Sequence, residues 1–360
     1  LADSNYVLTV TATDAAGNIS DASDALSITV DTTAPAQPSI TTTTSLTNDS
    51  TPAIEGVAEA GSTVTLFVDG VTTGVTTTAD GTTGAYTIAP TAALNDGAYA
   101  LTVKATDAAG NTSSASSALN LTVDTTAPAQ PSITTTTSLT NDSTPAIEGI
   151  AEAGSTVELF NGDASLGTTT ADGTTGAYTI TPAQLSDGDY VLTVKATDAA
   201  GNISAASDTL SMTVDATAPT QPAITTTTTL TTDATPTIEG TAEAGSTVTL
   251  LSSGVAIGTT TANGDGEFSI TTSTLADSNY VLTVTATDAA GNISDASDAL
   301  SITIDATAPG KPSIITTTSL TNDATPTIEG IAEAGSTVEL FNGDVSLGTT
   351  TADETTGAYT

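Results

Sequence analysis

Apolar and polar residues alternate along several short stretches of this chain. In residues 99–106, Tyr99, Leu101 and Val103 are each separated by one small or polar residue, and residues 119–123 repeat the pattern. Successive side chains of a β-strand point to opposite faces of a sheet, so a period of two predicts strands with one buried face. No stretch shows the 3.6-residue period of an amphipathic helix.

Turn sequences such as Asn-Asp, Ala-Gly and Asp-Gly separate these stretches. Within residues 31–123 we place strands at Gln37–Leu46, Ala53–Glu59, Thr63–Val68, Ala85–Ala89, Tyr99–Thr106 and Ala118–Val123. About seven short strands in roughly ninety residues are typical of an immunoglobulin-type β-sandwich. The predicted fold class is therefore all-β, because the alternative of a small closed barrel does not explain a linker that recurs between units.

A repeat of about ninety residues organises the whole chain. The string TDAAGN has its acid at Asp14, Asp107, Asp198 and Asp288, and the string D-(T/A)-T-A-P begins at Asp31, Asp124, Asp215 and Asp305. Both series step by 93, 91 and 90 residues. Two markers with one spacing predict a tandem array of Ig-like domains.

The spacing predicts three complete domains between two partial ones. The complete repeats are 31–123, 124–214 and 215–304, and the partial repeats are 1–30 and 305–360. Residues 1–30 match 275–304 almost letter for letter. We interpret the chain as a window cut from a longer array; the alternative is a subunit whose ends complete those of other copies head to tail.

Two further sequence features suggest structural roles. Tyr99, Tyr190 and Tyr280 each follow a turn and open the most apolar strand, which is the place of the tyrosine corner in Ig sandwiches. An ordinary core aromatic is the alternative, and the residue is structural in both cases. The threonine runs Thr41–Thr44 and Thr225–Thr229 predict an exposed edge strand, because β-branched residues favour extended backbone.

Composition narrows the possible functions. The chain has 41 acidic and three basic residues, no histidine and no cysteine, for a formal net charge of −38. This charge disfavours nucleic acid and anionic membrane surfaces as partners. Without histidine or cysteine the chain lacks the commonest general base, a thiolate nucleophile and the usual zinc ligands. We therefore predict that it is not an enzyme, and no apolar run is long enough to insert directly into a membrane.

Three acids recur in every repeat, in the linker, in the turn after the second strand and in the turn after the long tyrosine-led strand. An Ig topology brings these three positions to one end of the domain. The preceding unit adds its own acidic turn, around Asp96 or Asp187. The candidate metal ligands are Asp31, Glu59, Asp107, Asp124, Glu152, Asp198, Asp215, Glu243, Asp288, Asp305 and Glu333.

Converging carboxylates without arginine or lysine repel one another by about 4 kcal/mol per pair at ~4 Å and an effective dielectric of ~20. They must take up protons or a cation. Ligands that are all oxygen suit Ca²⁺ better than Mg²⁺, which demands a stricter octahedron. We predict Ca²⁺ at the junctions between domains. Two alternatives are open: the acids only shape turns through their own hydrogen bonds, or they belong to the acidic surface of a salt-loving organism.

The motifs D-T-T-A-P-x-x-P, P-x-I-E-G-x-A-E-A-G-S-T-V and D-G-x-Y-x-L-T-V-x-A-T-D-A-A-G-N resemble the tandem bacterial Ig-like repeats of giant biofilm-associated and RTX-type surface adhesins. The resemblance covers the whole chain. It implies a secreted extender at the bacterial cell surface, rigidified by calcium at its junctions, that supports cell adhesion and biofilm formation. Its partners would be the neighbouring repeats. No RTX nonapeptide, sugar-binding tip or membrane anchor is present in the sequence.

Two other functions are open alternatives. The units could bind glycans or proteins themselves, although the chain has no tryptophan or arginine, the side chains that binding hot spots favour. The chain could also be a subunit of an extracellular filament or sheath, an interpretation that is based on its out-of-phase ends.

Overall fold

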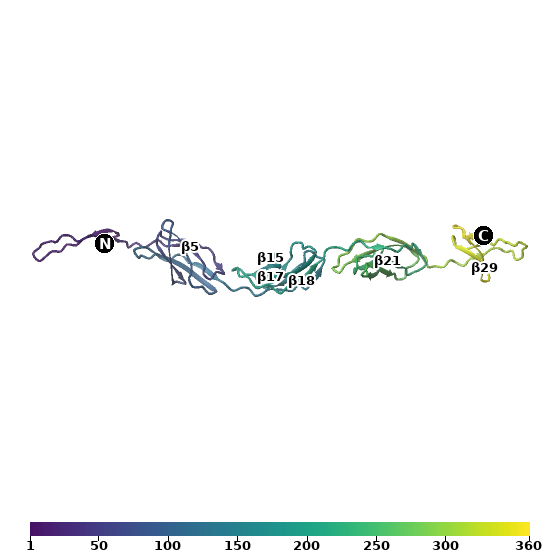
Figure 1. Ribbon diagram of the computed structural model, residues 1–360, viewed down its shortest axis with the longest axis horizontal. Coiled ribbons are helices and arrows are strands. Elements are labelled where there is room, and N and C mark those ends of the chain that lie inside the picture. The colour runs from purple at the N-terminus through teal and green to yellow at the C-terminus, as the bar shows by residue number, and fades with distance from the viewer. The chain divides into compact units, whose positions relative to one another are not determined.

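The computed structural model describes residues 1–360, and every regular element in it is a β-strand. Figure 1 shows arrows joined by loops and no coiled ribbon. The predicted all-β class is thus confirmed, and the chain has no helix of the length and apolarity needed to cross a membrane. The chain divides into two compact units, Leu1–Asp215 and Ala216–Thr360.

Residues 31–123 form two sheets. Their strands are β3 (Ser39–Ile40), β4 (Leu46–Thr47), β5 (Ile54–Val57), β6 (Thr63–Val68), β7 (Val71–Thr78), β8 (Ala85–Ile88), β9 (Gly97–Thr106) and β10 (Leu119–Val123). One sheet has the order β3-β5-β8 and the other β4-β10-β9-β6-β7. All neighbours are antiparallel except β4 and β10, which run parallel.

The next two repeats have the same pair of sheets. Residues 124–214 contain β11 (Ser132–Ile133), β12 (Leu139–Thr140), β13 (Ile147–Ile150), β14 (Thr156–Asn161), β15 (Ala164–Thr170), β16 (Ala177–Ile180), β17 (Gly188–Thr197) and β18 (Leu210–Val214). Residues 215–304 contain β19 (Ala223–Ile224), β20 (Leu230–Thr231), β21 (Thr237–Thr241), β22 (Thr247–Ser252), β23 (Val255–Thr261), β24 (Glu267–Thr271), β25 (Ser278–Thr287) and β26 (Leu300–Ile304). Each repeat again joins a three-stranded and a five-stranded sheet.

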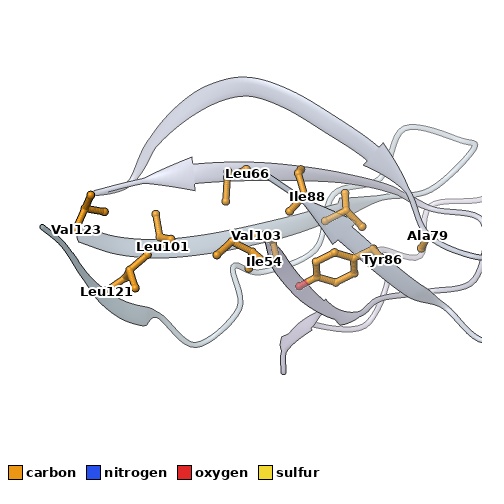
Figure 2. Close-up of a cluster of buried hydrophobic side chains, with 10 residues drawn as sticks. Ile54, Leu66, Ala79, Tyr86, Ile88, Leu101, Val103, Leu121 and Val123 are labelled. Carbon is orange, nitrogen blue, oxygen red and sulfur yellow. The ribbon is translucent and has the colours of Figure 1, made fainter. Parts of the chain in front are cut away.

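The core of each repeat lies between its two sheets. In Figure 2, Ile54 and Ile88 from the three-stranded sheet face Leu66, Leu101 and Val103 from the five-stranded sheet. These side chains are the apolar members of the period-two pattern, and all are buried. Burying one such side chain contributes about 1.5–3 kcal/mol. Because each repeat has its own separate core cluster, each has its own source of stability.

The first strand differs from the prediction. Instead of one strand over Gln37–Leu46, β3 pairs with β5 in one sheet and β4 pairs with β10 in the other. The threonine run Thr41–Thr44 connects them and is not a strand, so the edge-strand prediction was wrong for it and equally for Thr225–Thr229. The backbone leaves one sheet for the other here, which interrupts the pairing that strand propensity favours.

One edge strand was missed in the sequence. β7 reads VTTGVTTT and pairs with β6 at the edge of the five-stranded sheet. Threonine occupies both of its faces and a glycine interrupts it, so the apolar alternation that marks a half-buried strand is absent. β15 and β23 occupy the same edge in the following repeats.

The partial repeats contain fewer strands. Residues 1–30 form β1 (Ser4–Leu8) and β2 (Leu26–Val30), and residues 305–360 form β27 (Ser313–Ile314), β28 (Gly330–Ile331), β29 (Thr337–Asn342), β30 (Val345–Thr351) and β31 (Ala358–Tyr359). No second sheet covers β1 and β2. Ile28 is therefore 42% exposed, whereas Ile302, at the matching place in the third complete repeat, is 2% exposed.

The tyrosine corner predicted from the sequence is present. The hydroxyl of Tyr99 donates to the carbonyl oxygen of Asn95 at 2.9 Å. Tyr190 and Tyr280 make the same bond to the residue four positions upstream. These tyrosines fasten the turn that starts the longest strand, so their role is structural.

Candidate functional site

The predicted linker acids each follow the last strand of a repeat directly. Asp124 comes after β10, and its backbone N–H donates to the carbonyl oxygen of Thr47 at 2.9 Å, which extends the parallel pairing of β4 and β10. Its carboxylate oxygen Oδ1 accepts a hydrogen bond from the backbone N–H of Thr126 at 3.1 Å. Asp31 makes the same turn with Thr33. Asp215 and Asp305 take the corresponding places after β18 and β26.

The predicted TDAAGN acids organise the turn after the longest strand. Asp198 follows β17, and its carboxylate accepts from both the backbone N–H of Asn202 (2.9 Å) and the side-chain Nδ2 of Asn202 (2.8 Å). Burial raises the pKa of Asp198, but these hydrogen bonds outweigh it, and the pKa lies below the ordinary carboxyl value. Asp107 with Asn111, and Asp288 with Asn292, form the same turn.

The asparagine of this turn reaches the linker. Nδ2 of Asn202 also donates to the backbone carbonyl oxygen of Asp124 at 2.8 Å. In the preceding repeat, Nδ2 of Asn111 donates to the carbonyl oxygen of Asp31 at 3.0 Å. Two of the three predicted acids at each of these junctions therefore belong to one hydrogen-bonded network, joined by an amide that the sequence-based ligand set did not include.

A second acid holds the linker from the other side. Asp96, at the turn before β9, accepts from the backbone N–H of Thr125 (2.8 Å) and from the hydroxyls of Thr125 (2.7 Å) and Thr126 (2.6 Å). These bonds, the Thr126 hydroxyl first, lower the pKa of Asp96. Asp3 binds Thr32 and Thr33 in the same way, and Asp277 binds Ala306 and Thr307.

The predicted glutamates take another role. Glu59 lies in the short turn between β5 and β6, and Glu152 in the turn between β13 and β14. Their carbonyl oxygens accept from the hydroxyls of Ser62 and Ser155 at 2.7 Å. Glu243 and Glu333 make the same turn with Ser246 and Ser336. The side chain of Glu152 is exposed.

The eleven predicted ligands therefore lie in the linkers and turns of the repeats and do not form a metal-binding cluster. No group of three or more histidine, cysteine, aspartate or glutamate side chains in residues 1–360 is placed to hold a metal ion. The oxygen atoms at the junction are of the kind that calcium accepts. Two of them, Oδ2 of Asp198 and the carbonyl oxygen of Asp124, accept hydrogen bonds from the Asn202 amide. Calcium binding at these acids stays a prediction.

Sequence reasoning missed the side-chain amides of Asn111 and Asn202, whereas it did place an acidic turn around Asp96 at this end of the preceding repeat. The asparagines were visible as the last letter of a recurring motif, but the predicted ligand set contained only acids. Their partners in the linker lie 80 and 78 residues away in the sequence. For Asp96 the sequence indicated the acidic turn but not its partners Thr125 and Thr126.

Comparison with known protein families gives one match. A family model described as a bacterial Ig-like domain matches residues 36–125, 129–216 and 219–306. Together these ranges cover most of the chain and all three of its complete pairs of sheets.

Two curated proteins resemble parts of the chain. Exoglucanase B of Cellulomonas fimi is 36% identical over 230 residues, which are 59% of this chain and 20% of that protein. Chitinase A1 of Niallia circulans is 39% identical over 125 residues, which are 32% of this chain and 17% of that protein. The chain thus spans about a fifth or less of the length of these relatives.

Among solved structures, a biofilm-associated protein BSP domain is 14% identical, with 77% of this chain and 67% of that chain covered and a TM-score of 0.21. A likeness at this score carries no argument about function.

Proposed function

Because the chain belongs to the family of bacterial Ig-like domains and has three matched copies in tandem, we propose that it is a non-catalytic, extracellular spacer of a bacterial surface adhesin. Its work is mechanical: it keeps the parts of the adhesin on its two sides a set distance apart. The observation that carries the proposal is the linker. Residues Asp124–Thr126 are hydrogen-bonded to Asp96 in the repeat before and to Asn202 in the repeat after.

Small-angle scattering tests the spacer. A compact particle of 360 residues has a radius of gyration of about 21 Å. The longest strand of a repeat has ten residues, or about 33 Å at ~3.3 Å per residue. In this proposal the three repeats would lie end to end in solution as a rod of at least ~100 Å, with a radius of gyration of about 29 Å or more. A value near 21 Å would rule the spacer out.

Calcium at the junctions is the finer part of this proposal. The chain has 41 acids against three lysines and no arginine, so basic side chains are too few to compensate the acids of the turns. The surrounding donors are carboxylate and carbonyl oxygens, which are calcium ligands. In this proposal Asp124, Glu152 and Asp198 would hold the ion at one junction, and calcium would add to the restraint that the hydrogen bonds of the linker provide between the two neighbouring repeats.

Calorimetric titration of the full chain tests the calcium proposal. Asp124→Ala should reduce the number of bound calcium ions while both neighbouring repeats stay folded, because each has its own core. Asp163→Ala, at an exposed hairpin turn outside the predicted ligand set, is the matched control and should leave the titration unchanged. Full stoichiometry in Asp124→Ala would remove calcium from the proposal and leave the spacer standing.

Support of adhesion and biofilm formation is the cellular part of the proposal. Deleting residues 124–214 from the gene of the producing bacterium removes one repeat and preserves the phase of the array. A spacer should then still give adhesion, with a shorter reach beyond the cell surface. Loss of adhesion without loss of surface display would mean that this repeat itself binds a ligand.

The two curated relatives favour one second candidate. Both are named as polysaccharide-degrading enzymes, and this chain covers only a minor part of each. The same array would serve as a non-catalytic segment of an extracellular glycoside hydrolase. A pull-down of the purified chain with insoluble cellulose and chitin separates these roles. A pure spacer stays in the supernatant, and binding to either polymer would favour the hydrolase candidate.

A further inference from the structure

The amide of Asn202 lies between two oxygen atoms of different segments. Its Nδ2 is 2.8 Å from Oδ2 of Asp198 and 2.8 Å from the carbonyl oxygen of Asp124. An ionised carboxylate and a carbonyl can only accept hydrogen bonds, so the nitrogen of the amide must face both. Asn202 is 8% exposed, and its bond to a charged acceptor is of the stronger kind.

The aspartate of the turn orients this amide independently of the linker. In residues 1–30, Asn18 makes the same bond to Asp14 at 2.7 Å with no linker carbonyl among its hydrogen-bond partners. In the first complete repeat, Asn111 bonds to Asp107 at 2.9 Å and to the carbonyl oxygen of Asp31 at 3.0 Å. The amide is thus held ready by its own turn and reaches out to the chain that enters the repeat.

The linker has a second bond to the same repeat. Nε2 of Gln130 donates to the carbonyl oxygen of Ala206 at 2.7 Å, and Gln37 and Ala115 make the equivalent contact in the preceding repeat. Pro128, between Asp124 and Gln130, is buried. Together with the Asp96 contacts, these bonds connect the segment from Asp124 to Gln130 to the repeat before it and to the repeat after it.

We propose that Asn202, and Asn111 in the repeat before it, are positioning residues that latch the linker to the following repeat without any metal ion. The inference rests on the proposed spacer function and adds to it how a junction keeps its geometry. It also explains the pairing of the two recurrent motifs. TDAAGN supplies the aspartate and the asparagine of the latch, and D-(T/A)-T-A-P supplies the carbonyl that the latch binds.

Pairwise distances between spin labels test the latch in the full chain. The chain has no cysteine, so Glu55→Cys and Glu148→Cys give two single attachment points at matching exposed positions on β5 and β13. In the presence of a calcium chelator, the otherwise unchanged chain should give one narrow distance distribution. Asn202→Ala should lose this narrow peak. Asn18→Ala, the same turn residue away from the labelled junction, should keep it.

A second variant separates the latch from misfolding of the turn. Asn202→Asp keeps the size of the side chain but replaces the donor with an acceptor facing Asp198, so it should broaden the distribution at least as much as Asn202→Ala. Hydrogen-exchange protection of β17 should be unchanged in both, because the core of this repeat does not include Asn202. A narrow peak in Asn202→Ala, or a broad one in the chelated chain before substitution, would overturn the latch. Neither result bears on the scattering test of the spacer.

Discussion

Tyr86 reaches across a neighbouring strand to bind Ser39: its hydroxyl donates to the carbonyl oxygen of Ser39 at 2.8 Å. The strand in between is β5, where Gly56 lies opposite Tyr86 in the register. A Cβ on Gly56 would come within 2.2 Å of the tyrosine hydroxyl and 2.1 Å of the Ser39 oxygen. The aromatic ring therefore occupies the space that a side chain at Gly56 would need, and the three residues tie the strands of the smaller sheet together.

Gly56→Ala should destabilise the repeat 31–123 by about 3 kcal/mol or more, because overpacking and a lost buried hydrogen bond add together. Native-state hydrogen exchange at Leu101 measures this repeat separately from the others. Gly81→Ala is the matched control, since a Cβ there would meet nothing within 4 Å. Equal effects of the two substitutions would mean that Tyr86 can move aside.

Tyr86→Phe should be much milder and cost about 1 kcal/mol, the net value of one hydrogen bond. The third complete repeat already has Phe268 at this place, opposite Gly240, and keeps the same sheet. Burial raises the pKa of Tyr86 to about 12, so the hydroxyl keeps its proton and its bond at every ordinary pH. Hydrogen exchange at Leu101 again measures the loss, and an unchanged rate would contradict a contribution from the hydroxyl.

Ser113 substitutes for a missing strand partner. Its hydroxyl accepts from the backbone N–H of Ala105 at 2.9 Å, where β9 continues beyond its pairing with β10. Ser113→Ala leaves this buried N–H without its acceptor and should cost about 1–3 kcal/mol in the free energy of unfolding of the repeat. Ser114→Ala, at the exposed neighbour, should be neutral. Exchange of the Ala105 amide proton reports the effect directly, and equal rates in the two variants would argue against it.

The contact between Asp96 and the linker should depend on acid pH. Its hydrogen bonds from Thr126 and Thr125 lower the pKa of Asp96 below 3.8, so they favour the charged carboxylate. The stabilisation is fully present above pH 3.8 and is lost as the pH falls through the lower value of the folded protein. The carboxyl carbon of Asp96 and the amide proton of Thr125 should therefore titrate together below pH 3.8 in nuclear magnetic resonance spectra.

Asp96→Asn is the control for this titration, because the amide has no charge to lose in that range. The Thr125 resonance of the variant should then be independent of pH. A Thr125 resonance that titrates equally in both proteins would assign the change to another group.

The sandwich was predictable because its core residues follow a local pattern in the sequence. Leu101 and Val103 on β9, and Leu121 on β10, alternate with polar residues, and their burial follows from the period alone. The split of the first strand was not predictable in this way. Thr41 to Thr44 favour extended backbone whichever sheet they join, and only the competition between β5 and β10 for partners decides where pairing stops.

The residues of the junction were also predictable only in part. The acids Asp124 and Asp198 were found through recurrence, and the structure brings both to one network. The role of Asn202 depends on a carbonyl 78 residues away, and a backbone carbonyl leaves no trace in the identity of its residue. Sequence reasoning therefore selected the charged groups and missed the neutral amide that connects them.

The parallel pairing of β4 with β10 decides how a repeat responds to tension. β4 lies near the start of the repeat and β10 at its end, and the N–H groups of Thr122 and Asp124 bond to carbonyls of Ser45 and Thr47 at 2.8 and 2.9 Å. Pulling the two ends of the repeat apart slides these parallel strands past each other, so their hydrogen bonds are loaded in shear and must break together. An antiparallel pair at the same place would open one bond at a time, like a zip. Each sandwich therefore resists extension at its own boundary, before its core is strained.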